Sequence, residues 1–290
     1  MSRFSHPKNM CHILLLNTLS GDSMQLPITI LPGDRRMDFA ADYLAKKGGT
    51  FCSSWSQIPE SGYIVGGIPF TRDGRTVNTS IPEPLAIQSL LGMLTPNHIL
   101  VGGNLPESVT TACTHHGIKY YDVMTSGDFV QKNARLTAEG LLIPLLSHTA
   151  FSIYDCKTLL IGYGRCGREI ADILRFFVSE LYVCDIGRSE MKAARASHFH
   201  VITGNELQDR KHRVHQVNTI INTAPTNPFP SRTWGTFPED CVILNIASSP
   251  LSVPFPLSEQ VIPCPGIPGS YAPKTAGTIY AKEICNHFKV

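Results

Sequence analysis

The chain has 290 residues, of which 42% are hydrophobic and 17% charged, and its formal net charge at pH 7 is +2. A chain of this length can form two domains with separate cores, because domains usually contain roughly 100 to 200 residues. The small net charge gives no reason to expect nucleic acid as a partner. No run of about 18 apolar residues predicts a membrane span.

The number and spacing of the cysteines indicate whether the protein resides in a reducing or an oxidising compartment. The nine cysteines are scattered and form no C-x-x-C pair, which excludes a zinc ribbon or a disulfide framework and favours reduced thiols. We therefore expect a cytoplasmic protein without a metal site. The apolar run within residues 1–23 is too short for a signal peptide. We expect these residues to be either a disordered leader outside the fold or the result of a start site assigned too early.

An N-terminal α/β domain, on the substrate side, is predicted over residues 24–125, because strand and helix patterns alternate there as in βαβ units. The connection at 68–81 is polar, as is typical of a loop that overhangs a cleft. Strands are expected at 28–31, 63–65, 98–101 and 119–123, with helices after Arg36 and at about 84–94 and 106–116.

Residues 126–150 are expected to form a helical crossing between domains. Four leucines between 141 and 146 make an apolar stripe on it. Pro144 interrupts this stripe, removes one backbone hydrogen bond and is expected to kink the helix.

Residues 151–272 are predicted to form a Rossmann dinucleotide-binding domain, because six strand patterns follow in the rhythm of a doubly wound sheet. Both domains are thus expected to be doubly wound parallel α/β sheets. The segment 273–290 carries apolar residues at spacing four, so we expect a C-terminal helix that can return to the first domain. The six strands are expected at 158–162, 181–185, 200–202, 217–222, 241–246 and 261–264.

A buried strand, a glycine turn and a helix start follow each other directly at the beginning of this second domain. Gly162 would allow the tight turn, Gly164 would let a pyrophosphate approach the backbone, and Gly167 would let the helix pack on its strand. Arg165 and Cys166 fill the variable positions between them. The turn therefore predicts a dinucleotide site.

The choice between NAD and NADP stays open. Asp185 ends the second strand, 18 residues after Gly167, where a carboxylate would hydrogen-bond the adenosine ribose of NAD. Arg188 would instead meet the 2′-phosphate of NADP, and Asp185 can also be an ordinary solvated strand end. Small residues after the fourth and fifth strands either make room for a nicotinamide ring or are ordinary turn residues: Thr223, Ala224, Pro225, Ala247 and Ser248.

Cations that suit an anionic substrate occur in two places. Arg35 and Arg36 follow the first strand and are suited to forked pairing with a carboxylate, or they form a solvated charge cluster. Lys274 and Thr275 begin the C-terminal helix after a loop rich in proline and glycine. There they would meet an anionic group, or only initiate the helix after Pro273.

The start of the crossing helix offers further polar groups. Asn133 and Thr137 are expected to face the cleft between the domains. Glu139 is the only carboxylate in this group, and it either carries a proton or stabilises the helix start.

These residues resemble the family formed by the A subunit of dipicolinate synthase, a sporulation-linked oxidoreductase subunit. The similarity covers nearly everything after Met24. It rests on the glycine turn and on runs at 32–36, 133–140, 221–225, 265–269 and 272–277.

The resemblance implies oxidation of a dihydrodipicolinate-type ring to dipicolinate with NADP or NAD, together with a flavoprotein-like B subunit. It implies that Arg35, Arg36 and Lys274 bind the dicarboxylate and that Glu139, or a water it orients, accepts the ring proton. Lys274 and Asn133 are the other expected catalytic residues, and Thr137 and Thr275 are expected to bind the substrate. Homo-oligomers are also allowed. The competing hypotheses are a D-2-hydroxyacid dehydrogenase and a non-catalytic dinucleotide-sensing subunit.

The chain departs from the family pattern after the fifth strand. The family tends to have Asp followed by Ala-Ser-Arg-Pro, whereas this chain has Asn245 and then Ser249 in place of the arginine. If that arginine binds an anion in the family, its role passes here to Arg188, Arg35 or Lys274.

Overall fold

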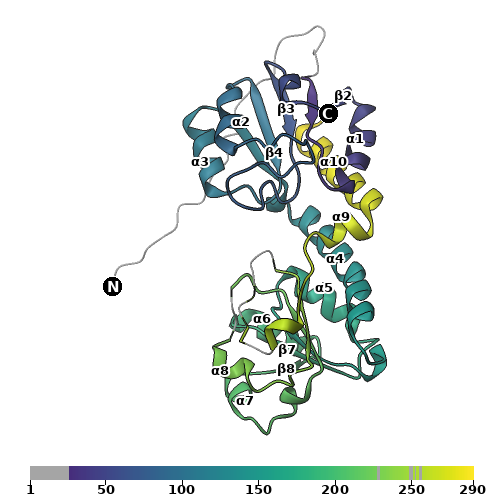
Figure 1. Ribbon diagram of the computed structural model, residues 1–290. Coiled ribbons are helices and arrows are strands. Elements are labelled where there is room, and N and C mark those ends of the chain that lie inside the picture. Colours follow the sequence, from purple (N-terminus) through teal and green to yellow (C-terminus); the bar gives the residue numbers. More distant parts are fainter. Residues whose placement is uncertain (1–25, 227–228, 248–250, 252, 255–256) are drawn as a thin grey trace, which may run out of the picture.

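The chain forms two α/β lobes joined by a long helix, as Figure 1 shows. The leader expected at 1–23 lies outside the described residues. The computed structural model describes residues 26–226, 229–247, 251, 253–254 and 257–290.

The first lobe contains a five-stranded sheet in the order β2-β1-β3-β4-β5, with every pair parallel. Ile64 and Leu100 pack into a core on one face, and Val65 and Val101 pack into a second core on the other, because successive strand residues point to opposite faces. The strands are β1 (Ile28–Ile30), β2 (Gly49–Phe51), β3 (Gly62–Val65), β4 (His98–Gly102) and β5 (Lys119–Asp122). The helices are α1 (Arg35–Ala45), α2 (Ile87–Met93), α3 (Glu107–His115) and the short turns η1 (Trp55–Gln57) and η2 (Val123–Thr125).

Strand β2 is missing from the sequence prediction. It lies at the edge of the sheet and its three residues are half-buried or exposed. No apolar run therefore marks it in the sequence.

The second lobe contains a six-stranded parallel sheet in the order β11-β10-β9-β6-β7-β8. Counted from β6, this is the strand order of a Rossmann sheet, in which ligands bind where the order reverses, here between β6 and β9. The strands are β6 (Lys157–Ile161), β7 (Glu180–Cys184), β8 (His200–Val201), β9 (Thr219–Asn222), β10 (Val242–Asn245) and β11 (Val261–Pro263). The helices are α5 (Arg165–Leu174), α6 (Arg188–Ala196), α7 (Gly204–Gln208), α8 (Ser231–Trp234), η3 (Ile153–Asp155), η4 (Arg213–Gln216) and η5 (Leu257–Gln260).

Both faces of this second sheet are also covered. Leu160 and Val183 pack in the core shared with α4 and α5, whereas Leu159 and Tyr182 pack on the opposite face. The prediction of two doubly wound parallel sheets is confirmed.

Helix α4 (Gly127–His148) connects the lobes, where a helix was expected at 126–150. The Ser126 hydroxyl caps its start by accepting the Phe129 N–H at 3.3 Å. The helix continues through Pro144 and contacts α5.

The C-terminal helix α10 (Pro273–Phe288) returns to the first lobe, as predicted (Figure 1). A Cβ on Gly277 would overlap the carbonyl oxygen of Arg36 and lie 2.8 Å from the Ala40 nitrogen, so α10 packs on the backbone of α1. Tyr280 is fully buried and donates its hydroxyl to the carbonyl of Gly66 at 2.7 Å. The segment before α10, expected as a shaped loop, contains the short helix α9 (Ile267–Tyr271).

In the described part of the chain, no helix is long and apolar enough to cross a membrane. The same residues contain no group of three or more histidine, cysteine or acidic side chains that could hold a metal ion, and each described cysteine is free.

Candidate functional site

The glycine turn has two packed glycines and one open glycine. Gly162 has φ 93°, and a Cβ there would overlap the Thr223 hydroxyl. A Cβ on Gly167 would overlap the carbonyl oxygen of Gly162. A Cβ on Gly164, by contrast, would meet no atom within 4 Å, so space is left over the backbone of the turn.

That space is a cavity of about 340 Å³ at the carboxyl ends of β6, β7 and β9. The residue before α5 is Gly164, and no side chain caps the start of this helix. The first N–H groups of α5 therefore have no hydrogen-bond acceptor within the helix. Free N–H groups at a helix start and an uncovered glycine together fit a pyrophosphate. The lining residues include Gly162, Gly164, Arg165, Cys166, Gly167, Asp185, Ile186, Glu190, Thr223, Ala224 and Pro225.

Asp185 connects the end of β7 to the glycine turn. Its carboxylate accepts the N–H of Tyr163 at 2.6 Å and the N–H of Gly187 at 2.7 Å. Asp185 lines the cavity, and so does Glu190, which is not among the site residues predicted from the sequence. Arg188 begins α6 with an exposed side chain and is not among the described lining residues.

The ends of β9 and β10 meet beside the cavity. Thr223 donates its hydroxyl to the carbonyl of Ile161 at 2.9 Å, which ties β9 to β6. Asn222 donates its side-chain amide to Asn245 Oδ1 at 2.8 Å, so the side chains that pair at the ends of β9 and β10 are both neutral. Ala247 is half-buried after β10. Ser248 and Ser249 lie outside the described residues.

Cys166 lies in the first turn of α5, beside Thr137 of α4. Burial raises the pKa of its thiol to about 11, although the Thr137 hydroxyl opposes this shift. The thiol is therefore protonated at neutral pH and packs as a small apolar group.

At the carboxyl edge of the first sheet, Arg36 is buried and paired with Asp34. The Arg36 Nε donates to Asp34 Oδ1 at 2.9 Å, and its Nη2 lies 2.9 Å from Oδ2. Asp34 also caps α1 by accepting the Arg36 N–H at 3.1 Å. Arg35, one residue earlier, is exposed. The two arginines therefore do not present the paired fork that their adjacency predicts.

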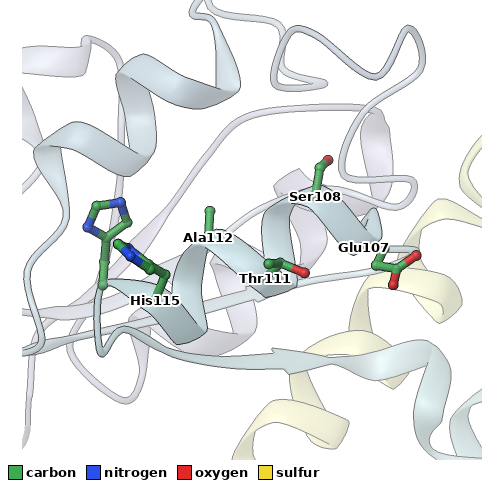
Figure 2. A pocket seen from close by; sticks show the side chains of 6 residues that line it. Glu107, Ser108, Thr111, Ala112 and His115 are labelled. Carbon is green, nitrogen blue, oxygen red and sulfur yellow. The ribbon is translucent and has the colours of Figure 1, made fainter.

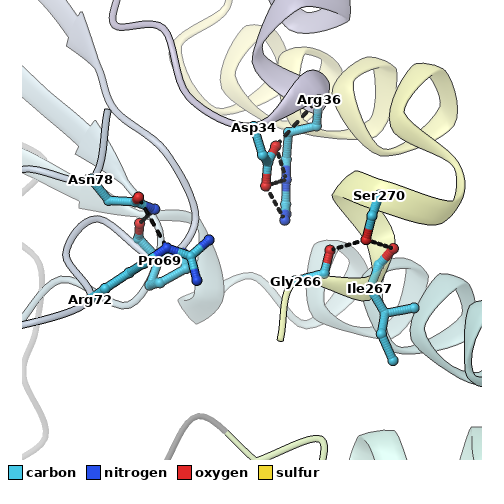
Figure 3. Close-up of polar contacts among 8 residues, drawn as sticks. All are labelled: Asp34, Arg36, Pro69, Arg72, Asn78, Gly266, Ile267 and Ser270. Carbon is cyan, nitrogen blue, oxygen red and sulfur yellow. Dashed lines mark hydrogen bonds and ion pairs between the residues drawn. The ribbon is translucent and has the colours of Figure 1, made fainter. Parts of the chain in front are cut away.

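Arg72 is a second arginine at this edge, and the candidate residues chosen from sequence do not include it. Its Nε donates to Asn78 Oδ1 at 3.2 Å, and the Asn78 amide donates to the carbonyl of Pro69 at 2.8 Å. Figure 3 shows the Arg36 side chain pointing down from its helix and the Arg72 side chain in the loop to its left. The polar loop at 68–81 was the sequence signal for this residue.

The remaining predicted residues lie on α4 and α10. Thr137 is buried and donates its hydroxyl to the carbonyl of Asn133 at 2.9 Å. Glu139 is half-buried. Lys274 and Thr275 are exposed in the first turn of α10. None of these five residues is among the described residues that line the cavity of the glycine turn.

Two glycines allow α9 to lie between the lobes. A Cβ on Gly140 of α4 would overlap Ile267 Cγ2, and a Cβ on Gly269 would lie 2.5 Å from Asp34 Oδ2. Helix α9 therefore touches both α4 and the carboxylate that holds Arg36. This packing explains why the two segments carry glycine at these positions.

A larger hollow of about 560 Å³ lies on the outer side of α3. Figure 2 shows Glu107, Ser108, Thr111, Ala112 and His115 along it. All of its lining residues come from α3 and the following His116. It is therefore a surface depression on one helix, without the converging elements of a built site.

The Rossmann strand order, the open glycine and the uncapped start of α5 define an α/β protein of the dinucleotide-binding type. No protein-family model matches the chain. The chain is 26% identical to the A subunit of dipicolinate synthase from Bacillus subtilis over 199 residues, which span 66% of this chain and 65% of that protein. The chain is thus a homologue of that A subunit, and the resemblance seen in the sequence is confirmed.

Solved structures agree on the fold. The structure of the dipicolinate synthase A subunit from Bacillus halodurans matches with a TM-score of 0.79 at 19% identity, covering 91% of this chain and 98% of that one. The A chain of dipicolinate synthase from Bacillus subtilis matches with a TM-score of 0.75 at 20% identity, covering 92% and 96%. A transhydrogenase from Sinorhizobium meliloti matches with a TM-score of 0.51 at 12% identity, covering 68% and 69%.

Proposed function

We propose that the chain is the nicotinamide-dependent oxidoreductase subunit of a dipicolinate synthase, acting in sporulation. The observation that carries the proposal is the cavity of about 340 Å³ built on an open Gly164, in a homologue of the dipicolinate synthase A subunit. The uncovered glycine lies at the carboxyl edge of a Rossmann-type sheet, directly before α5, which is where such domains bind the pyrophosphate of a dinucleotide.

The proposed reaction is aromatisation of a dihydrodipicolinate-type ring to pyridine-2,6-dicarboxylate. The ring must lose a hydride and a proton, and the oxidised nicotinamide supplies the hydride acceptor when it is bound. The protein must orient the ring and accept the proton. We assign proton acceptance to Glu139, or to a water that it orients, because it is a half-buried carboxylate on the helix between the two lobes.

Charge at the carboxyl edge of the first sheet supports a dicarboxylate substrate. Asp34 occupies one edge of the Arg36 guanidinium, and Arg72 adds a second positive charge in the neighbouring loop (Figure 3). Two guanidinium groups against one carboxylate leave a net positive charge, which a dicarboxylate would neutralise. Arg35, Lys274, Thr275, Thr137 and Asn133 complete the proposed substrate and catalytic set.

A histidine-dependent 2-hydroxyacid dehydrogenase has less support. Such an enzyme needs a histidine paired with a carboxylate beside the cofactor. Among the described residues, the histidine within ion-pair distance of a carboxylate is His212, 3.8 Å from Glu206. Neither of these residues lines the cavity of the glycine turn.

The homologue is named for one subunit of a synthase, so we propose that the partner is a second, flavoprotein-like B subunit, in the cytoplasm of the sporulating cell. The test combines the purified chain and its B subunit with the condensation product of pyruvate and aspartate semialdehyde. Dipicolinate should form, detected by its ultraviolet absorbance, faster than the spontaneous rate with NAD or NADP. No increase with either cofactor would reject the proposal.

A further inference from the structure

Two carboxylates lie next to each other just after the end of β7, in the wall of the cavity over the glycine turn. Asp185 and Glu190 both line this cavity. A Cβ on Gly187 would overlap Oε2 of Glu190 and would lie 3.2 Å from Oδ1 of Asp185. The two acidic groups therefore converge over the backbone of one glycine, at the place where a Rossmann domain holds the adenosine ribose.

The two carboxylates are held in different ways. Asp185 accepts the backbone N–H groups of Tyr163 and Gly187 at 2.6 and 2.7 Å, so it fixes the glycine turn to the end of β7. Glu190 accepts the hydroxyl of its neighbour Ser189 at 2.5 Å and holds no other segment of the described chain. Replacing Asp185 would disturb the turn itself, whereas replacing Glu190 leaves the turn intact.

Glu190 is ionised at neutral pH. The Ser189 hydroxyl, followed by a backbone N–H and the positive charge of Arg168, lowers the pKa of its carboxyl. Arg188, which the sequence suggested as the cation for a 2′-phosphate, is exposed. It is not among the described residues of the cavity wall. The guanidinium in the described wall belongs to Arg165, the first residue of α5 in the glycine turn.

We propose that Glu190 is the residue that makes this site select NAD(H) against NADP(H), with Asp185 acting chiefly as the support of the glycine turn. This inference rests on the nicotinamide-dependent function proposed above. Ribose hydroxyls donate hydrogen bonds to carboxylates. A 2′-phosphate carries close to two negative charges at pH 7 and is repelled by carboxylates. Asp185 occupies the position where Rossmann domains usually bind the ribose. The cofactor preference is nevertheless set by Glu190.

The test measures binding of NADH and NADPH to the full chain by calorimetry and by the fluorescence of the bound dihydronicotinamide. Wild type should bind NADH at least about tenfold more tightly than NADPH. Glu190→Gln should strengthen NADPH binding while leaving NADH binding within about threefold, and Glu190→Arg should reverse the preference. Glu107→Gln, in the first turn of α3, is the matched control and should leave both affinities unchanged.

Four outcomes would count against this assignment. Wild type that binds NADPH as well as NADH overturns it, as does a Glu190→Gln variant in which both affinities fall equally. Folded protein that binds neither dinucleotide overturns the proposed oxidoreductase function, and this inference with it. A clear preference for NADPH overturns the inference alone, because the cofactor site would still exist.

Discussion

Gly269 lies against the carboxylate of Asp34, so closely that a Cβ on the glycine would be 2.5 Å from Asp34 Oδ2. Asp34 in turn holds the buried guanidinium of Arg36. The segment that leaves the second lobe therefore contacts the ion pair at the edge of the first. Any side chain at position 269 must displace Asp34, α9 or both.

Gly269→Ala should destabilise the protein by about 1–3 kcal/mol, because the added methyl group overpacks the contact between α9 and Asp34. Gly92→Ala is the matched control. It lies inside α2 with no atom within 4 Å of its Cβ position, so it should be neutral or slightly stabilising. Urea unfolding of the two variants measures the difference, and equal midpoints would contradict the packing argument.

Gly164→Val should abolish binding of either nicotinamide dinucleotide without loss of stability. The valine side chain has free space, but that space is the cavity over the glycine turn. Gly167→Ala should instead unfold or strongly destabilise the protein, because its Cβ overlaps the carbonyl oxygen of Gly162. Calorimetric titration and thermal unfolding separate the two effects. Undiminished NADH binding by Gly164→Val would place the cofactor elsewhere.

Arg72→Ala should weaken binding of dipicolinate by about tenfold to a hundredfold, the effect of losing a hydrogen bond to a charged group. Binding of picolinate, which has one carboxylate, should change less. Arg75→Ala is the matched control, since Arg75 is exposed in the same loop. Titration calorimetry gives the affinities. If Arg72→Ala and Arg75→Ala behave alike, Arg72 does not contact the substrate.

His215 should make the protein less stable in mild acid. It is buried, and its Nδ1 is 2.7 Å from the Thr236 hydroxyl. Burial lowers the pKa of His215 below the ordinary value of 6.5. The folded state therefore favours the neutral ring. Its contribution to stability is present above pH 6.5 and is lost as pH falls through the lower pKa of the folded state.

The measurement is the unfolding midpoint of wild type and of His215→Phe between about pH 8 and pH 5. The variant cannot take up this proton, so its stability should fall less on acidification. Because His287 also has a lowered pKa, both proteins should keep some dependence on pH, and the difference between them isolates His215. Parallel curves would show that His215 does not titrate on unfolding.

The candidate site shows where local reasoning fails. Arg35 and Arg36 are adjacent in the sequence and were expected to act together. Successive residues of a helix point about 100° apart, so α1 turns Arg36 inward to Asp34 and leaves Arg35 in solvent. Arg72 lies in the polar loop at 68–81, which the sequence marks, but its contact with Asn78 appears only in the folded chain. Glu190 was not predicted as a site residue, because its place in the cavity wall depends on how the chain folds after β7.

The two parallel α/β lobes and the glycine turn could be predicted from the sequence. Both depend on short-range features: the alternation of apolar runs and helical periods, and the spacing of Gly162, Gly164 and Gly167. Only the tertiary structure decided why Gly140, Gly269 and Gly277 must be glycine, and which charged groups converge at each edge. These depend on contacts between segments far apart in the chain, which side-chain overlap and charge in three dimensions control.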